Sequence, residues 1–213
     1  MSTHVVGSER ASALAEEAPP PAAVAGDPQV LGLPAFAVGS IALGLALVGY
    51  VPVTAQQAAL PIIFAMTGIG LLIATVWAAA LGQTMVATVF GLFAGFWLSY
   101  VVLIVGLSHA WWAVPSENLN RSVELFLISW AVIMGALTIA TMRLPVAYTA
   151  VIALVVVALV LLIFGTAETS DALNKAAGYV TLVFAALGVY LFLAQADAAA
   201  GGSGYPLGAP LRR

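Results

Sequence analysis

The sequence predicts an all-α integral membrane protein built as a bundle of six transmembrane helices. Of its 213 residues, 63% are hydrophobic and only 7% are charged, and the mean hydropathy is +1.11. A soluble domain carries about 25% charged residues, so this chain has too few charges to cover a water-exposed surface. Six apolar runs have about the 20 residues that a helix needs to cross a bilayer. The runs are continuous rather than alternating, which argues against a membrane-spanning barrel.

Composition separates the chain into three regions. Residues 1–26 are rich in Ala, Ser, Glu and Pro without an apolar period, which predicts a disordered cytoplasmic tail. Residues 27–197 hold the six spans and form the transmembrane domain, and residues 198–213 form a C-terminal tail. The first region lacks the basic start and apolar stretch of a signal peptide, so we expect the first span to direct insertion.

The spans are separated by short connections whose residues favour helix ends. Pro52 closes the first span, and Gly82 begins a tight turn between the second and the third. Residues 108–122 form the longest loop, where paired Trp side chains suit the depth of the lipid headgroups. Ser170 or Asp171 is a candidate N-cap for the last span. The predicted spans are residues 33–51, 59–81, 85–107, 123–142, 146–165 and 175–196.

The positive charges indicate how the spans are oriented. Cytoplasmic loops carry an excess of Lys and Arg, so the side with more of them is predicted to face the cytoplasm. The side that holds both termini carries Arg10, Arg143, Arg212 and Arg213, and the other side carries Arg121 and Lys175. This distribution favours a protein of the plasma membrane with both termini in the cytoplasm.

The segment from Asp27 to Phe36 is predicted to shape the mouth of a pore. Asp27 followed by Pro28 is a strong helix-start signal, because a carboxylate oxygen can cap the helix and Pro fixes φ at the first helical position. Pro34 has no N–H, which predicts a kink or a break in the helix there. Gly32 allows close backbone approach, and free N–H groups at a helix start are a common way to hold a small anion. The predicted pore-mouth residues are Asp27, Pro28, Leu31, Gly32 and Leu33.

Several classes of function find no support in the sequence. The chain has no Cys, and its two His residues, His4 and His109, are far apart, so neither a metal site nor a cofactor is expected. A net charge of −3 argues against nucleic-acid binding. Because no Ser/His/Asp set, Walker loop or pair of intramembrane carboxylates is present, the protein is predicted not to be an enzyme.

Motifs spread over residues 27–208 narrow the prediction. Asp27-Pro28-Gln29-Val30-Leu31-Gly32-Leu33 is followed by Phe36, and the third span carries Phe93-Ala94-Gly95-Phe96-Trp97-Leu98. Further matches are Trp130, Gly165, Gly178-Tyr179, Tyr190 and Pro206-Leu207-Gly208. On these residues the chain resembles the acetate uptake transporter family, the YaaH-type acetate–succinate permeases. That family has Asn-Pro-x-Pro-Leu-Gly-Leu in the first motif and Tyr-Gly-x-Phe-Trp-Leu in the second.

The resemblance implies a membrane transporter or channel for short-chain monocarboxylates, with acetate as the first candidate and succinate as a further one. Transport would be proton-coupled or would pass the protonated acid, because a bare charge is costly in a low-dielectric path. It also implies homo-oligomers, often hexamers, in the lipid bilayer. A narrow apolar constriction is implied at Phe36, Phe93 and Val155. Further residues expected to line the pore are Leu71, Trp97 and Tyr100.

The chain also departs from the pattern of the family, and these departures leave alternatives open. Asp27 replaces a neutral Asn, so its carboxylate is either a helix cap or a protonatable gate. Leu71 and Ala78 stand where the family often has polar residues, which makes this pore more apolar. Aromatic residues at helical spacing often serve only to pack helices. The alternatives are therefore a non-transporting membrane sensor or assembly subunit with the same fold, or a permease for another small solute.

Overall fold

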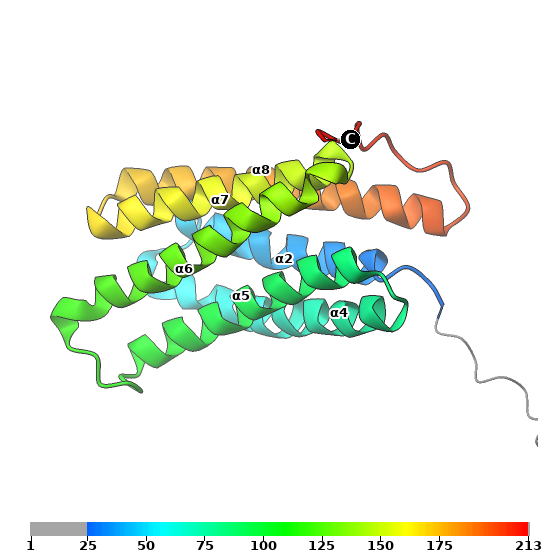
Figure 1. Ribbon diagram of the computed structural model, residues 1–213. Helices are drawn as coiled ribbons and strands as arrows, with labels where there is room; N and C mark the ends of the chain where they lie inside the picture. Colours follow the sequence, from blue (N-terminus) through cyan, green and yellow to red (C-terminus); the bar gives the residue numbers. More distant parts are fainter. Residues whose placement is uncertain (1–24, 213) are drawn as a thin grey trace, which may run out of the picture.

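Six helical segments long and apolar enough to cross a membrane run back and forth between two ends of the molecule (Figure 1). The computed structural model describes residues 25–212, so the predicted disordered tail lies outside the described residues up to residue 24. The long helices are α2 (Gln29–Val48), α4 (Gly70–Ala80), α5 (Thr84–Ser108), α6 (Leu119–Ala140), α7 (Val146–Ala167) and α8 (Asp171–Ala199). The predicted six-helix membrane fold is confirmed.

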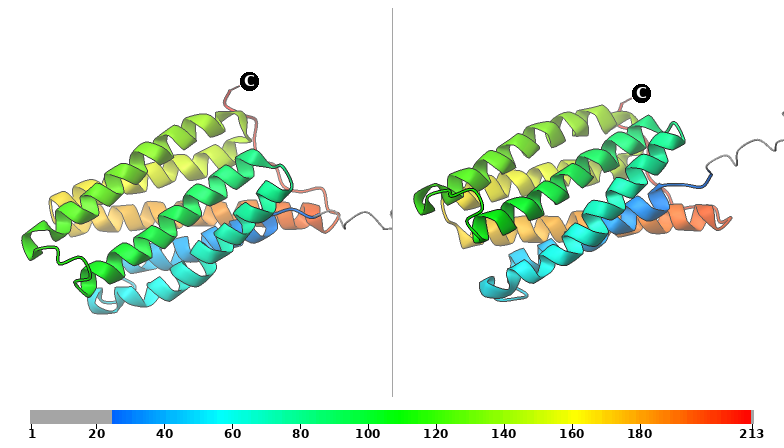
Figure 2. Two further views of the ribbon diagram at one scale, coloured as in Figure 1. Left: turned by 60° about the horizontal axis from the view of Figure 1, so that its bottom comes forward. Right: turned by 90° about the horizontal axis from the view of Figure 1, so that it is seen from below.

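Two further views show that the helix axes are roughly aligned with one another, as the spans of a membrane bundle must be (Figure 2). Within the hydrocarbon region each backbone N–H and C=O has to find its partner inside the helix, which long uninterrupted helices provide. The first described residues and the last ones lie at the same end of this bundle, together with the α4–α5 and α6–α7 turns. We call this end the termini end.

The first span starts earlier than predicted and is not broken. A kink or a break was expected at Pro34, but α2 begins at Gln29 and continues through Pro34 to Val48. The helix is therefore not broken at Pro34, and the alternative of a kink stays a prediction. A single missing N–H removes one intrahelical bond, and neighbouring helices pack around this segment, so the rest of the helix is maintained.

The second span is irregular in a way that the sequence did not indicate. It begins as the 3-10 helix η1 (Val53–Ala59), passes through the short α3 (Leu60–Ile62), and becomes the π-helix η2 (Ile63–Ile69) before α4. A π-helix is rare and holds more residues per turn than an α-helix. This segment therefore sets which residues of α4 face the interior, among them the fully buried Leu71.

Small residues allow α2 and α8 to pack closely. A Cβ atom at Gly178 of α8 would lie 2.8 Å from Cβ of Leu47 and 3.0 Å from the backbone nitrogen of Val48. In α5, Gly91 and Gly95 lie four residues apart but do not form a single seam, because Gly91 faces Thr75 and Gly95 faces Trp130. Glycine spacing alone thus indicated close contacts but not the helices that share them.

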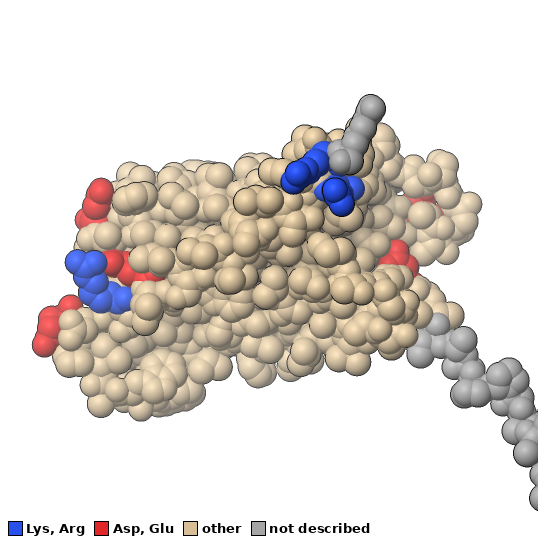
Figure 3. Space-filling view, in the orientation of Figure 1, with Lys and Arg blue, Asp and Glu red and all other residues tan. Residues whose placement is uncertain are grey.

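The distribution of charge agrees with a protein embedded in a bilayer. In the space-filling view the charged side chains gather toward the two ends, and the band between them is free of charge (Figure 3). At the end opposite the termini, Arg121 pairs with Glu124 at 2.8 Å and Lys175 pairs with Asp171 at 2.7 Å. The predicted N-cap is confirmed, since the Ser170 hydroxyl accepts a hydrogen bond from a backbone N–H in the first turn of α8.

The C-terminal tail folds back onto the bundle. After α8 ends at Ala199, residues 201–212 return past the termini end to the α6–α7 turn (Figure 1). The Tyr190 hydroxyl donates to the carbonyl of Pro206, and the backbone N–H of Ala147 donates to the carbonyl of Leu207. The composition of this segment predicted a simple tail, whereas in the structure it is an ordered part of the bundle.

Candidate functional site

A cavity of about 310 Å³ lies between the helices and reaches inward from the termini end. Its walls come from α2, α4, α5, α7 and α8, from the α6–α7 turn, and from the C-terminal tail. The residues that line it are Gln29, Leu33, Phe36, Leu71, Met85, Val86, Val89, Phe90, Phe93, Leu144, Pro145, Tyr148, Val151, Ile152, Leu191, Gln195 and Leu207. This volume suits a small ligand with few atoms.

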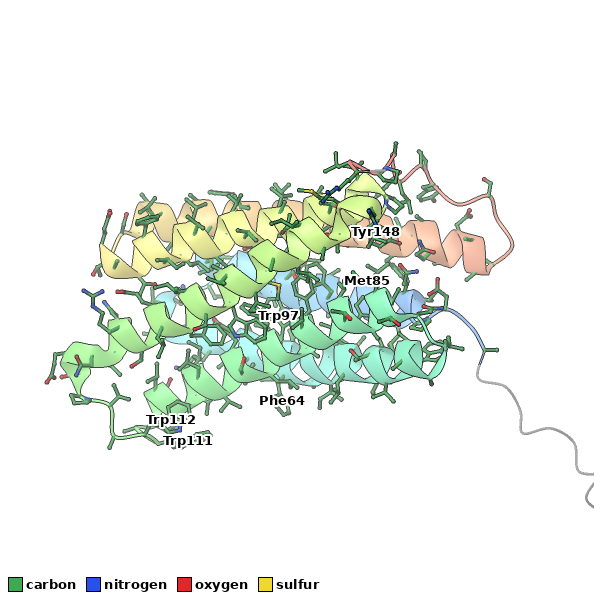
Figure 4. The ribbon with its side chains drawn as sticks, in the orientation of Figure 1. Phe64, Met85, Trp97, Trp111, Trp112 and Tyr148 are labelled. Atoms are coloured by element: carbon green, nitrogen blue, oxygen red, sulfur yellow. The ribbon has the colours of Figure 1, made fainter. Side chains whose placement is uncertain are left out.

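The walls of the cavity follow from helical spacing. Residues three, four and seven apart share one face of a helix. On α2 this spacing places Gln29, Leu33 and Phe36 on the face toward the cavity, and α5 and α7 contribute similar faces. Figure 4 shows Met85 of α5 and Tyr148 of α7 at the termini end, on opposite sides of this space.

Two aromatic rings of the cavity wall pack against each other. The centroids of the Phe36 and Phe93 rings are 4.9 Å apart, with the ring planes at 65° in an edge-to-face contact. Phe184 of α8 also packs against Phe36, at a centroid distance of 5.7 Å. Phe36 and Phe93 are buried and also line the cavity. Such contacts hold both rings in place in the wall of the cavity, between α2 and α5.

A polar group of three side chains lies among the apolar walls; we call Gln29, Tyr148 and Gln195 the polar triad. The Tyr148 hydroxyl donates to Oε1 of Gln29 at 2.7 Å, and it accepts from Nε2 of Gln195 at 2.6 Å. These residues come from α2, α7 and α8, so the triad ties three helices together at the termini end. Each amide nitrogen has two N–H groups, and Gln195 uses only one of them on Tyr148.

Asp27 supports the polar triad from outside the cavity. Its Oδ1 accepts the backbone N–H of Gln29 at 2.9 Å, and its Oδ2 accepts from Nε2 of Gln29 at 3.5 Å. The backbone N–H of Val30 donates to the Asp27 carbonyl. The helix start thus uses its first donors internally. The expectation that free N–H groups at this position hold an anion does not match this arrangement.

The structure separates the predicted pore-mouth residues. Leu33 lines the cavity, whereas Asp27, Pro28, Leu31 and Gly32 do not. Pro28 is buried at the helix start, and Leu31 packs against the hydrophobic core. A Cβ atom at Gly32 would overlap the ring of a cavity-lining Phe of α5, so this glycine allows the two helices to approach.

Of the other predicted pore residues, some line the cavity and others do not. Phe36 and Phe93 meet at the cavity, and Leu71 lines it from α4. Val155 is 5% exposed and belongs to the same core, but it lies one helical turn beyond the α7 residues that line the cavity. Trp97 and Tyr100 do not line the cavity either. They pack against Phe96 in an aromatic group between α5 and α6.

The polar triad was missed as a unit by reasoning from the sequence. Gln29 belongs to the first sequence motif, whereas neither Tyr148 nor Gln195 had a predicted role. Each residue lies within about two turns of the end of an apolar run, where polar side chains commonly face the headgroups. A useful signal would have been that all three belong to the same end of a six-span topology.

Chemically, the cavity can accept a small and mostly apolar molecule with one polar group. Its lining, as far as the structure describes it, contains no Lys, Arg, Asp or Glu. Within residues 25–212 there is also no group of three or more His, Cys, Asp or Glu side chains that could hold a metal ion. Spare N–H donors of the triad suit an acceptor such as a carboxyl oxygen.

Comparison with known proteins finds a family whose sequence profile matches most of the chain. The sequence profile of the GPR1/FUN34/yaaH family matches residues 11–201. Acetate permease A of Emericella nidulans is 29% identical over 180 residues, which cover 79% of this chain and 60% of that protein. Ammonia transport outward protein 2 of Saccharomyces cerevisiae is 26% identical over 176 residues, which cover 81% of this chain and 62% of that protein. The chain thus spans about three fifths of the length of these relatives.

A solved structure has the same fold. The structure of the bacterial acetate channel SatP superposes with a TM-score of 0.76 at 24% sequence identity, and the match covers 86% of this chain and 99% of the other. Because the identity is this low, the likeness concerns the arrangement of the helices. Nearly all of that chain is matched by the six-helix unit described above.

Proposed function

The chain belongs to the GPR1/FUN34/yaaH family, and on that premise we propose that it is a membrane transporter or channel for short-chain monocarboxylates, with acetate as the first candidate. The observation that carries the proposal is the small cavity with apolar walls, a polar triad at the termini end, and the Phe36–Phe93 contact farther in. The proposed site consists of the triad and the residues that line this cavity. Two of the relatives it matches are named for acetate and ammonia.

The chemical form that passes is the protonated acid. Moving an ionised carboxylate into a medium of low dielectric costs tens of kcal/mol when no partner compensates the charge. No cationic side chain of the described residues lines this cavity. A neutral carboxylic acid avoids that cost, and its carbonyl oxygen can accept a hydrogen bond from the spare N–H group of Gln195. The apolar constriction then passes a neutral molecule more readily than an ion.

The test is a flux assay with purified protein in proteoliposomes. Labelled acetate is offered at a fixed total concentration while the external pH is lowered, with protein-free vesicles subtracted. In the range where most acetate is ionised, protein-dependent flux should rise about tenfold for each unit of pH, in proportion to the neutral acid. No protein-dependent acetate flux at any pH would refute the proposal. Succinate in a parallel assay establishes how far the cavity admits a second carboxyl group.

A second candidate function is passage of a small neutral solute such as ammonia. It is favoured by the uncharged apolar cavity and by the relative named for ammonia transport. The same vesicles, loaded with a pH indicator and exposed to an ammonium gradient, distinguish the two. Ammonia flux without acetate flux would replace the first proposal. Flux of neither would favour a membrane sensor or assembly subunit that retains the fold.

Tyr148→Phe should reduce acetate flux at low acetate concentration by about fivefold, since one hydrogen-bonding hydroxyl typically contributes about 1 kcal/mol. The hydroxyl orders both Gln29 and Gln195, so its loss leaves two amides without a fixed orientation. The concentration dependence of flux checks this, with the main change expected in the half-saturating concentration.

Asp27→Asn is the matched control for this prediction. Asn retains an oxygen that can accept the backbone N–H of Gln29, so the helix start should remain capped. Acetate flux should stay within about twofold of the parent, because this residue lies outside the cavity. A large loss of flux in correctly folded Asp27→Asn would instead identify Asp27 as a protonatable gate.

The proposal extends to the setting of the protein. We place it in the plasma membrane with the termini end in the cytoplasm, which the excess of Arg on that side supports. We also propose homo-oligomers, with six copies as the expected number from the family. Large apolar side chains such as Val76 and Val132 are 64% and 67% exposed in the single chain, so they are free to face lipid or another copy.

A further inference from the structure

We propose that the C-terminal residues Gly201–Arg212, which we call the C-terminal strap, control access to the cavity from the termini end. The inference concerns the regulation of the site under the proposed function and rests on it for the nature of the ligand. It starts from one observation, which is that Leu207 of the strap lines the cavity together with residues of the transmembrane helices. The wall of the cavity is therefore completed by a segment outside the membrane spans.

The strap is seated at three separate points. The Tyr190 hydroxyl of α8 donates to the Pro206 carbonyl at 2.7 Å. The backbone N–H of Ala147 donates to the Leu207 carbonyl at 3.1 Å, which satisfies a donor in the first turn of α7. Near the end of the strap, the backbone N–H of Arg212 donates to the carbonyl of Met142 at 2.9 Å.

These anchors place the strap next to the polar triad. Ala147 directly precedes Tyr148, and Tyr190 lies on the same helix as Gln195, so two anchors are within a few residues of the triad. Leu207 lines the same cavity as Gln29 and Gln195, so the strap forms part of the wall beside the polar triad. Lifting the strap would remove this part of the wall and widen the access to the triad.

The strap lies on the surface and is joined to α8 by a turn that contains glycine. Gly201 and Gly204 adopt φ values of 90° and 70°, conformations that glycine reaches readily, so the chain can reverse direction just after α8. The turn is held by Asp197, whose carboxylate accepts the backbone N–H of Gly204 at 2.9 Å. Outside its anchors the strap is superficial, with Tyr205 45% exposed and Leu211 63% exposed. The strap is held by its three hydrogen-bonded anchors, by the Asp197 turn, and by stacking of Tyr205 on Tyr190 with the ring centroids 5.8 Å apart, so these are the contacts that must break for it to lift.

The first experiment measures access without requiring transport. The chain contains no Cys, so Ile152→Cys introduces a single thiol on the cavity wall at a position that is 2% exposed. Its rate of modification by a small methanethiosulfonate reagent is measured in the purified full-length protein in detergent. Adding Tyr190→Phe removes one anchor and should accelerate modification about fivefold, in line with the loss of one hydrogen bond.

Tyr179→Phe in the same background is the matched control. It makes the same change on the same helix, but Tyr179 is 62% exposed and near the end opposite the termini. Its modification rate should equal that of Ile152→Cys alone. Equal rates for the Tyr190→Phe and Tyr179→Phe proteins, with matching thermal transitions, would overturn the inference. Leu207→Ala provides a second variant, which should accelerate modification by removing the side chain that lines the cavity.

A disulfide that holds the strap in place serves as a reversible lock. It tests whether flux falls when the strap cannot lift. A Cβ atom at Gly208 would lie 3.7 Å from Cβ of Val146, close to the spacing of about 3.8 Å across a disulfide. Gly208 has a φ of 77°, so Cys there costs about 1–2 kcal/mol in backbone strain, which a disulfide can offset. Val146→Cys with Gly208→Cys should therefore cross-link the strap to α7. Oxidation is expected to lower acetate flux at least fivefold, and reduction should restore it within the same sample.

The lock also separates this inference from the proposed function. Unchanged flux in a fully cross-linked protein would overturn control by the strap. If acetate flux is absent from the parent and from every variant, the proposed function fails. In that case the modification rates still decide whether the strap controls access to the cavity.

Discussion

Replacing Phe93 by Ala is expected to raise acetate flux about tenfold, which corresponds to lowering the barrier to passage by about 1.4 kcal/mol. The Phe93 ring packs edge-to-face against Phe36 with the ring centroids 4.9 Å apart, and both rings line the cavity at the proposed constriction. Without the ring, water and substrate can enter this part of the bundle, which a dry apolar constriction excludes. Flux of labelled acetate in proteoliposomes measures the effect. Selectivity over succinate should fall at the same time.

Phe96→Ala is the control on the same helix. Phe96 is as well buried as Phe93, but its ring packs against Phe126 and Trp130, at 5.6 Å from each, and does not line the cavity. Both substitutions remove a buried ring and should destabilise the protein by about 3–5 kcal/mol. Higher flux in both proteins would point to general loosening of the bundle. A rise confined to Phe93→Ala supports a role in the constriction, and Phe93→Leu should then show a smaller rise.

Gly178→Ala is expected to destabilise the folded protein by about 1–3 kcal/mol, the usual range for overpacking a well-filled interface. The added methyl group would lie 2.8 Å from Cβ of Leu47 and 3.0 Å from the backbone nitrogen of Val48. These atoms belong to the backbone or are fixed to it, so relief requires α2 and α8 to separate. Thermal unfolding of the purified protein, followed by circular dichroism, measures the change.

Gly135→Ala gives the comparison for this stability prediction. No atom lies within 4 Å of a Cβ placed at Gly135 in the middle of α6, so the methyl group meets no neighbour. Alanine also has a better helix propensity than glycine by up to about 1 kcal/mol. The Gly135→Ala protein should be at least as stable as the parent. Equal losses at the two positions would show that glycine in this bundle is required for a reason other than close packing.

The fold could be predicted from the sequence because its main determinant is local. Each span is an apolar run of sufficient length, and a bilayer leaves few other ways to satisfy the backbone of such a run. The tight turn is similarly local, since Gly82 has a φ of 70°. The residue at which α2 starts was harder to predict, because an Asp-Pro helix start and an internal Pro34 give opposing signals within a few residues.

The candidate site depends on contacts between distant parts of the chain, and these were only partly predictable. The Phe36–Phe93 pair was identified through resemblance to a family, since nothing in the spacing of either helix relates the two rings. Tyr148 is 119 residues from Gln29 and 47 from Gln195, so their hydrogen bonds leave no local pattern. Trp97 and Tyr100 follow Phe93 at helical spacing on α5. Both nevertheless pack against Phe96 in the aromatic group between α5 and α6, and they do not line the cavity.

The π-helix between Ile63 and Ile69 lets the second span hold about one more residue than an α-helix would in the same stretch. An α-helix advances by about 100° for each residue, so an extra residue placed in a regular α-helix would turn everything after it by that angle. The widened turn absorbs the extra residue, and Leu71 and Ala74 stay fully buried. A single-codon deletion within the π-helix, for example of Phe64 on the outer surface (Figure 4), should therefore restore a regular α-helix and be tolerated, whereas the same deletion within α4 should turn the residues after it toward lipid.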